Sequence, residues 1–256
     1  PGESQLFGEA LAQMTGPGRI LVVAAGNSSN LLTYVSKPQG KDTAGSGLNT
    51  GGDCAKAFLM SDQPFRLKLI TLASDNVTLT DSITIGTDNL PTDSILFRSR
   101  HIMLERAGSF YTLTDRRELD NLPDNRTLLV AIEGEEASVE MFAELRANFV
   151  NFPPYQMANP RFNCATNTHN VELPGSLPGA VTIGALNGRQ SYVNINGEEV
   201  ASFGTMSPLG AMAFFSSQGP TKDGRVKPDV TSPGVNVISA GNSYCPKSFG
   251  SQMVTK

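Results

Sequence analysis

Two apolar runs, one near the start of the sequence and one in its last third, constrain the fold more than any other feature. Residues 20–25 (ILVVAA) and 180–185 (AVTIGA) contain almost only apolar or small side chains. Runs of this kind fit strands that are buried on both faces, as in a parallel sheet covered by helices. Residues 4–14 precede the first run and have apolar residues at helical spacing on one face, namely Leu6, Phe7, Ala10, Leu11 and Met14. We therefore predict an α/β architecture around these runs.

The chain between the two runs has a different pattern. Short segments rich in apolar side chains are separated by turn residues, and they recur at intervals typical of strands. This pattern predicts an inserted antiparallel β-sandwich or jelly roll. The segments are 65–69, 77–79, 83–85, 95–97, 111–113 and 128–132.

Three other segments have less regular patterns. Residues 41–53 are rich in Gly, Ser and Thr and are predicted to form a loop. Residues 139–150 fit either one amphipathic helix or another strand. Residues 192–200 resemble a small hairpin whose turn is Asn196-Gly197.

These patterns divide the chain into three regions. The two outer regions have the α/β pattern, and the middle region has the β-rich pattern. We place the first α/β part at residues 1–30, the inserted domain at 31–168 and the second α/β part at 169–256.

The composition argues against several classes of function. The net charge of −4 gives no basic surface for nucleic acid. No apolar run approaches the roughly 18 residues needed to cross a membrane. Cys54, Cys164 and Cys245 lie far apart, and the chain has only two histidines, so a zinc site is not expected. We favour three unpaired thiols over one disulfide, and the cysteine count leaves the redox compartment open.

Four segments, in the same order, resemble the subtilase family of subtilisin-like serine proteases. They lie only in the two outer regions. Some bacterial subtilases carry a jelly-roll insertion where residues 31–168 lie. The segments are 22–28 (VVAAGNS), 173–185 (LPGSLPGAVTIGA), 215–220 (FSSQGP) and 223–240 (DGRVKPDVTSPGVNVISA).

The resemblance implies an oxyanion-hole role for Asn27. A tetrahedral intermediate concentrates negative charge on one oxygen, and a side-chain amide fixed at a strand end meets that charge without reorganising. Gly26 before it allows a close backbone approach. Taken alone, Asn27 would fit an ordinary turn asparagine, and the other three segments reverse that preference.

The resemblance also implies a substrate cleft. Ala24, Ala25 and Gly26 resemble the wall of the pocket that takes the side chain preceding the scissile bond. A second set resembles a loop near the catalytic centre, although a plain Ser/Gly turn fits it equally well. That set is Ser216, Ser217 and Gly219.

The catalytic triad of the family has no match in this chain. The mechanism needs a nucleophilic Ser, a His as general base and an Asp that orients it. The family places Asp-Thr/Ser-Gly and His-Gly-Thr motifs before the oxyanion asparagine, and residues 1–26 contain neither. His101 and His169 lie where the family has no catalytic histidine.

The position of the nucleophile depends on the register at the end of the chain. In one register, residues 250–253 (GSQM) occupy the serine motif, and Gln252 replaces the nucleophile. In the other, residues 253–256 lead into a motif that follows them, and we favour this second register. In either register we expect this polypeptide alone to be inactive.

Three functions remain open from the sequence. The first is a catalytic-domain fragment of a serine endopeptidase that cleaves a peptide or protein substrate, with the triad on a continuous or complementary chain. The second is an inactive subtilase-like protein that binds peptide. The third is a binding module in residues 31–168, which recognises carbohydrate, protein or a propeptide, although this region lacks Trp and has no aromatic cluster.

The family resemblance also bears on cofactors and location. We expect no cofactor, although calcium commonly stabilises the family and its ligands cannot be identified in this sequence. The resemblance implies a secreted, periplasmic or cell-surface protein.

Overall fold

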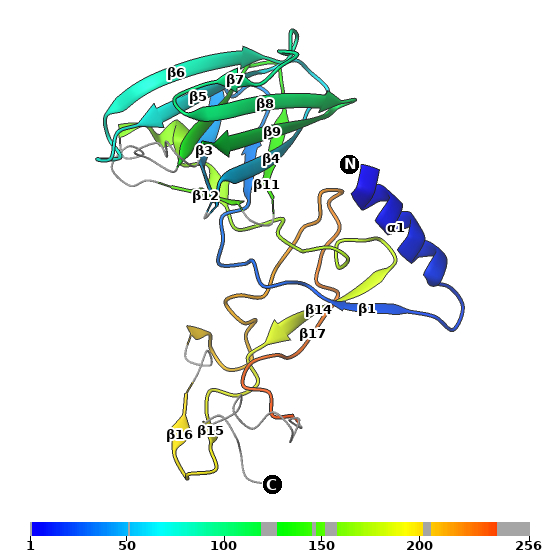
Figure 1. Cartoon of the computed structure of the whole chain (residues 1–256). Coiled ribbons are helices and arrows are strands. Elements are labelled where there is room, and N and C mark those ends of the chain that lie inside the picture. The colour runs from blue at the N-terminus through cyan, green and yellow to red at the C-terminus, as the bar shows by residue number, and fades with distance from the viewer. Residues whose placement is uncertain are drawn as a thin grey trace. The chain divides into compact units, whose positions relative to one another are not determined.

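The computed structural model describes residues 2–50, 52–118, 127–144, 147–151, 158–201 and 206–239. The chain divides into two compact units (Figure 1). We call Pro1–Asn30 with Thr168–Lys256 unit 1, and Leu31–Asn167 unit 2. Strands dominate the described residues, and helices are few.

Unit 1 contains a parallel sheet and a helix. Helix α1 (Gly2–Met14) precedes strand β1 (Leu21–Ala24), which pairs in parallel with β14 (Ala180–Leu186). Strand β17 (Val230–Pro233) pairs in parallel with the other side of β14, so the strand order is β1-β14-β17. The predicted helix and the two predicted strands are confirmed, and the parallel sheet is present in this part of the chain.

The prediction that the first apolar run is buried on both faces is wrong. More buried and more exposed residues alternate along β1 and β14, because other described residues cover only one face of this sheet. Thr182 on the covered face is fully buried, whereas Val22 on the opposite face is 52% exposed. Strand β17 is exposed along its whole length.

Unit 1 also contains the predicted hairpin. Strands β15 (Tyr192–Val193) and β16 (Glu199–Val200) pair antiparallel. Asn194 stabilises the turn, because its Oδ1 accepts hydrogen bonds from the backbone N–H groups of Asn196 and Glu198, both at 2.9 Å. Gly197 adopts a φ of 79°, which favours glycine at this turn.

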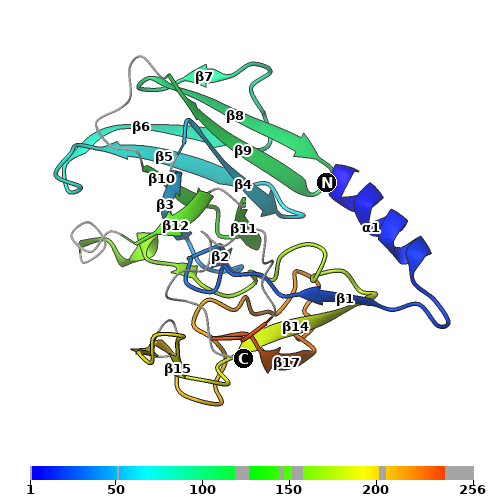
Figure 2. The ribbon, with the colours of Figure 1, turned by 60° about the horizontal axis from the view of Figure 1, so that its bottom comes forward.

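Unit 2 consists of two antiparallel sheets, whose strands form two layers (Figure 1, Figure 2). The five-stranded sheet has the order β12-β3-β10-β5-β6, and the seven-stranded sheet has the order β13-β2-β11-β4-β9-β8-β7. One core cluster takes apolar side chains from both sheets, among them Leu48, Leu59, Leu113 and Val130. The strands are β2 (Tyr34–Lys37), β3 (Thr43–Thr50), β4 (Cys54–Met60), β5 (Arg66–Leu72), β6 (Leu79–Gly86), β7 (Ile95–Leu96), β8 (Arg100–Ala107), β9 (Phe110–Arg117), β10 (Leu128–Glu133), β11 (Val139–Ala143), β12 (Ala147–Val150) and β13 (Ala165–Thr166).

The prediction of a loop at residues 41–53 is wrong, because most of this stretch is strand β3. Its glycines pack against neighbouring chain: a Cβ on Gly45 would clash with the backbone of Val130, and a Cβ on Gly47 would lie 2.6 Å from Thr127. Glycine in a strand interior marks such close backbone approach. The open choice at residues 139–150 resolves as two strands, β11 and β12.

Two of the three cysteines lie in the described residues. Cys54 and Cys164 are free thiols and half-buried. Burial is the main cause that raises the pKa of the Cys54 thiol. Cys245 lies outside the described residues.

Candidate active site

Asn27 is exposed and follows β1 at the carboxyl end of a parallel strand. Functional groups of open α/β sheets gather at this end of the strands. Gly26 immediately before it has a φ of 107°, a conformation that side chains other than glycine rarely adopt. A Cβ at Gly26 would also lie 2.5 Å from Cδ of Glu172. The backbone conformation therefore favours glycine here, and a larger residue would also have to displace the Glu172 side chain.

Glu172 binds the turn that contains Asn27. Its Oε1 accepts hydrogen bonds from the backbone N–H of Asn27 at 3.2 Å and from the Ser28 hydroxyl at 2.5 Å. Its own backbone N–H donates to the carbonyl of Ala25 at 2.9 Å. Glu172 lies one residue before the segment that resembles the family, and no pattern in the sequence singled it out.

Ser217 and Asn170 hold the same turn through other atoms. The Ser217 Oγ accepts from the backbone N–H of Ser28 at 2.9 Å, and the Ser217 N–H donates to the Gly26 carbonyl at 3.0 Å. The Asn170 side-chain amide donates to the Ser28 carbonyl at 3.1 Å, and its Oδ1 accepts from the backbone N–H of Gln218 at 2.7 Å. Three segments distant in sequence therefore meet at this turn.

The remaining residues predicted for the cleft lie in the same unit. Ala24 is exposed at the end of β1, and Ala25 is buried. Ser216 is buried, and its Oγ accepts from the Ala185 N–H at 2.9 Å. Gly219 donates its N–H to the Lys227 carbonyl at 2.9 Å. Ser216 and Ser217 use their hydroxyls within the protein.

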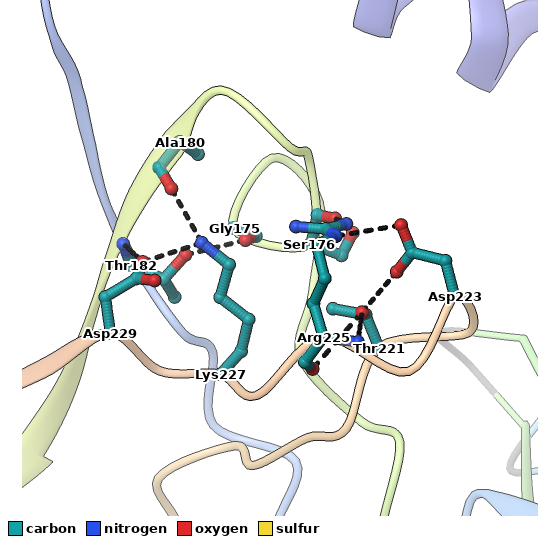
Figure 3. A network of polar contacts seen from close by, with 9 residues as sticks. All are labelled: Gly175, Ser176, Ala180, Thr182, Thr221, Asp223, Arg225, Lys227 and Asp229. Carbon is teal, nitrogen blue, oxygen red and sulfur yellow. Dashed lines mark hydrogen bonds and ion pairs between the residues drawn. The ribbon is translucent and has the colours of Figure 1, made fainter.

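Lys227 and Asp229 join the strands of the parallel sheet (Figure 3). The Lys227 Nζ donates to the Ala180 carbonyl at 2.7 Å and to Asp229 Oδ2 at 2.6 Å. The same Asp229 oxygen accepts from the Thr182 N–H at 2.7 Å. The Lys227 hydrogen bond, followed by the Thr182 N–H, lowers the pKa of the Asp229 carboxyl group.

A second polar group extends this network (Figure 3). Arg225 donates from Nη2 to the Ser176 carbonyl at 2.7 Å and from Nε to Asp223 Oδ2 at 2.8 Å. The Thr221 hydroxyl donates to the other Asp223 oxygen. The hydrogen bonds from Arg225 and Thr221 lower the pKa of Asp223 to about 2. We call Thr221, Asp223, Arg225, Lys227 and Asp229 the polar clamp, because it ties residues 221–229 to residues 175–182.

The described part of the chain contains no group of three or more His, Cys, Asp or Glu side chains that could hold a metal ion, so the calcium implied by the family resemblance is assigned no ligands. No helix of the described residues is long and apolar enough to cross a membrane. Gln252, the residue that replaces the nucleophile in one register, lies outside the described residues.

Comparisons with known proteins show what parts of this chain are similar to. Residues 158–255 match the model of the subtilase family, peptidase S8. This part of the chain is similar to the subtilase family, as its motifs indicated.

Individual relatives match only in part. Serine protease AprX of Bacillus subtilis (strain 168) is 34% identical over 87 residues, which cover 33% of this chain and 17% of that protein. The structure of the Clostridium perfringens CspB protease superposes with a TM-score of 0.57 at 14% identity, covering 88% of this chain and 43% of that one. At this identity the superposition shows a shared fold alone. The matched parts of this chain therefore span less than half the length of either relative.

Proposed function

We propose that this chain is part of a subtilisin-like serine endopeptidase and supplies the oxyanion hole through Asn27. The observation that carries the proposal is the exposed Asn27 at the carboxyl end of β1, on a turn held by Glu172 and Ser217. A donor on a rigid strand end is already oriented when negative charge develops on the substrate oxygen. The match of residues 158–255 to the subtilase family supports this chemistry.

In this proposal the complete enzyme cleaves peptide bonds through an acyl-enzyme. The serine, the histidine and the aspartate of the triad come from sequence outside this chain. The exposed Ala24, with Ala25 and Gly26, forms the wall of the pocket for the residue before the scissile bond. Ser217 donates its backbone N–H to the Gly26 carbonyl in this wall. The predicted contacts of Ser216, Ser217 and Gly219 with substrate stay predictions.

Partners and location follow from the same proposal. A peptide or protein is the substrate, and a propeptide or a complementary chain that carries the triad is a further partner. We also propose export to the medium, the periplasm or the cell surface, which the family resemblance supports. We propose that the complete domain is a subtilisin-like α/β fold interrupted by a jelly-roll insertion. The inserted sandwich, residues 31–168, serves as an accessory domain.

The test is an alanine substitution at Asn27 in the full-length polypeptide that contains this chain. Removing an oxyanion donor lowers kcat by about 10²–10³ with little change in KM, a range measured in subtilisin and carried over to this relative. Asn30→Ala is the matched control, because Asn30 is exposed three residues later. Steady-state hydrolysis of a fluorogenic peptide gives both constants.

Two results would contradict the proposal. A kcat for Asn27→Ala within twofold of the parent would remove the oxyanion role. Peptide binding without turnover by the full-length protein would favour the alternative of an inactive, peptide-binding subtilase. We also expect no turnover by residues 1–256 alone, and purified polypeptide that hydrolyses the peptide would overturn that expectation.

A further inference from the structure

We infer that Glu172 is a positioning residue that fixes the oxyanion donor Asn27, an inference that rests on the proposed function. The Glu172 side chain binds the turn at Asn27 through two hydrogen bonds. One carboxylate oxygen receives hydrogen bonds from two consecutive residues, the Asn27 N–H at 3.2 Å and the Ser28 hydroxyl at 2.5 Å. The backbone N–H of Glu172 adds a third bond to Ala25 at 2.9 Å.

The side chain of Glu172 also fills the space beside Gly26. Its Cγ and Cδ lie 2.7 and 2.5 Å from the position that a Gly26 Cβ would occupy. Glycine in the positive-φ region has wide conformational freedom, so a turn that begins with it needs external contacts to hold one shape. Glu172 supplies these contacts on both sides of the glycine, at Ala25 and at Asn27.

Positioning matters because the donor acts over a short range. A misplacement of about 1 Å in a catalytic group can cost about 10²-fold in rate. The Asn27 N–H and its side chain share one Cα, so an acceptor that fixes the N–H also restricts where the side-chain amide points. Glu172 thus acts through Asn27 and contacts no reacting atom in this proposal.

The charge of Glu172 works against the same chemistry. A carboxylate near a developing oxyanion raises its energy through repulsion between like charges. Glutamine keeps an oxygen that accepts the same hydrogen bonds, but it carries no charge. If Glu172 acts by positioning, the acceptor matters and the charge does not, and the glutamine variant separates the two.

The surrounding contacts keep the turn folded when Glu172 is changed. Ser217 binds the Ser28 N–H and the Gly26 carbonyl, and Asn170 binds the Ser28 carbonyl. Among the described residues, Glu172 is the acceptor for the Asn27 N–H. Its loss is therefore expected to free Asn27 while leaving Ser28 in place.

The experiment compares Glu172→Ala and Glu172→Gln in the full-length polypeptide, each with and without Asn27→Ala. We expect Glu172→Ala to lower kcat by about 10- to 100-fold with KM within about threefold, and Glu172→Gln to stay within about threefold of the parent. On the Asn27→Ala background, Glu172→Ala should add less than about twofold, because both changes remove the same contribution. Glu199→Ala is the control, since its carboxylate bonds Ser191 within the hairpin.

Three outcomes would overturn the inference. One is Glu172→Ala within twofold of the parent while Asn27→Ala is strongly impaired. Another is a Glu172→Ala effect that multiplies in full on the Asn27→Ala background, which indicates a role independent of Asn27. The third is a Glu172→Gln variant as impaired as the alanine variant, which assigns the effect to charge.

Amide hydrogen exchange distinguishes failure of this inference from failure of the proposed function. Glu172→Ala should speed exchange at the Asn27 amide by at least about fivefold and Glu172→Gln should not, whether or not the protein is a protease. Unchanged exchange in Glu172→Ala overturns the inference. An Asn27→Ala variant with normal kcat, together with the expected exchange, overturns only the proposed function.

Discussion

Strands β1 in unit 1 and β10 in unit 2 have nearly the same apolar character but different surroundings. Leu21–Ala24 reads LVVA and Leu128–Glu133 reads LLVAIE. The first alternates between half-buried and exposed residues, whereas the second is buried at every residue but the last. An apolar run therefore predicts a strand, but the neighbouring elements decide how many of its faces are buried.

Apolar side chains pack against β10 on both faces of its sheet. Leu128, Val130 and Ile132 join the core between the two sheets. Leu129 and Ala131 form a second cluster with Ile70, Leu72 and Phe162, the last from the 3-10 helix η2 (Pro160–Phe162). In unit 1, by contrast, Val22, Val181 and Val230 stay exposed on one sheet face of the described chain.

The two units therefore depend on different forces. Unit 2 is held by an apolar core with a buried ion pair inside it. Unit 1 is held, around its sheet, by the hydrogen bonds and ion pairs of the polar clamp. Substitutions that remove one kind of contact should separate the stabilities of the two units.

The largest effect is expected for Asp115→Ala in unit 2. Asp115 and Arg100 are both fully buried and form an ion pair. Burial raises the pKa of Asp115 and lowers the pKa of Arg100, and each partner charge opposes that change. Removing one partner leaves a buried charge, which costs about 3–5 kcal/mol of unfolding free energy. Denaturant-dependent amide exchange in β8 and β9 measures it.

Two further variants sharpen this prediction. Arg116→Ala changes an exposed charge on the same strand and should alter the unfolding free energy by less than about 0.5 kcal/mol. The double variant Arg100→Met/Asp115→Leu should recover part of the loss, because it removes both charges of this ion pair but leaves the buried Arg117 guanidinium beside it. A single Asp115→Ala variant as stable as the Arg116→Ala control would show that the ion pair contributes nothing.

An intermediate effect is expected for Thr182→Val on the covered face of the unit 1 sheet. The fully buried Thr182 hydroxyl donates to the Gly175 carbonyl at 2.6 Å. Valine keeps the shape but leaves that carbonyl without this donor, at a cost of about 1–3 kcal/mol. Amide exchange in β14 reports the loss.

The opposite substitution, at the residue just before Thr182, is the control. Val181 lies on the open face of the same strand and is 37% exposed. Val181→Thr should change the unfolding free energy by less than about 0.5 kcal/mol. Equal losses of unfolding free energy for Thr182→Val and Val181→Thr would mean that the two faces of this sheet do not differ in burial.

The smallest effect is expected from acid titration of the polar clamp. The pKa of Asp223 is lowered to about 2 and that of Asp229 is also lowered. A lowered folded-state pKa stabilises the protein above the unfolded-state pKa of about 3.9, and this contribution disappears as the pH falls toward 2. Unit 1 should therefore lose stability between about pH 4 and pH 2.

Asp223→Asn tests this pH dependence. The variant should be slightly less stable than the parent at neutral pH and should show a shallower loss in acid, and added salt should shrink the difference because Asp223 is exposed. Amide exchange of unit 1 at several pH values gives the comparison. Identical acid profiles for the parent and the variant would exclude a contribution from Asp223.

The local elements could be predicted wherever a pattern lies within a few residues. The helix before β1, strands β1 and β14, and the Asn194–Gly197 turn all have such patterns. Strand β3 was missed because its glycines oppose strand formation locally, and only the close neighbours at Val130 and Thr127 explain them.

The candidate site was predictable only in part, for a similar reason. Asn27 belongs to a recognisable motif, but its partner Glu172 lies 145 residues away. The buried hydroxyls of Ser216 and Ser217 bond backbone groups of other segments, so their motif gave no indication of where they would point.

The sequence by itself determined the resemblance to the subtilase family, through four motifs in order, and the strand character of its apolar runs. The tertiary structure alone decided which face of each strand is covered, which carboxylate binds the turn at Asn27 and which charges are buried together. The physical reason is that apolar periodicity and turn preferences act over a few residues, whereas burial and hydrogen-bond partners come from segments that meet only when the chain folds.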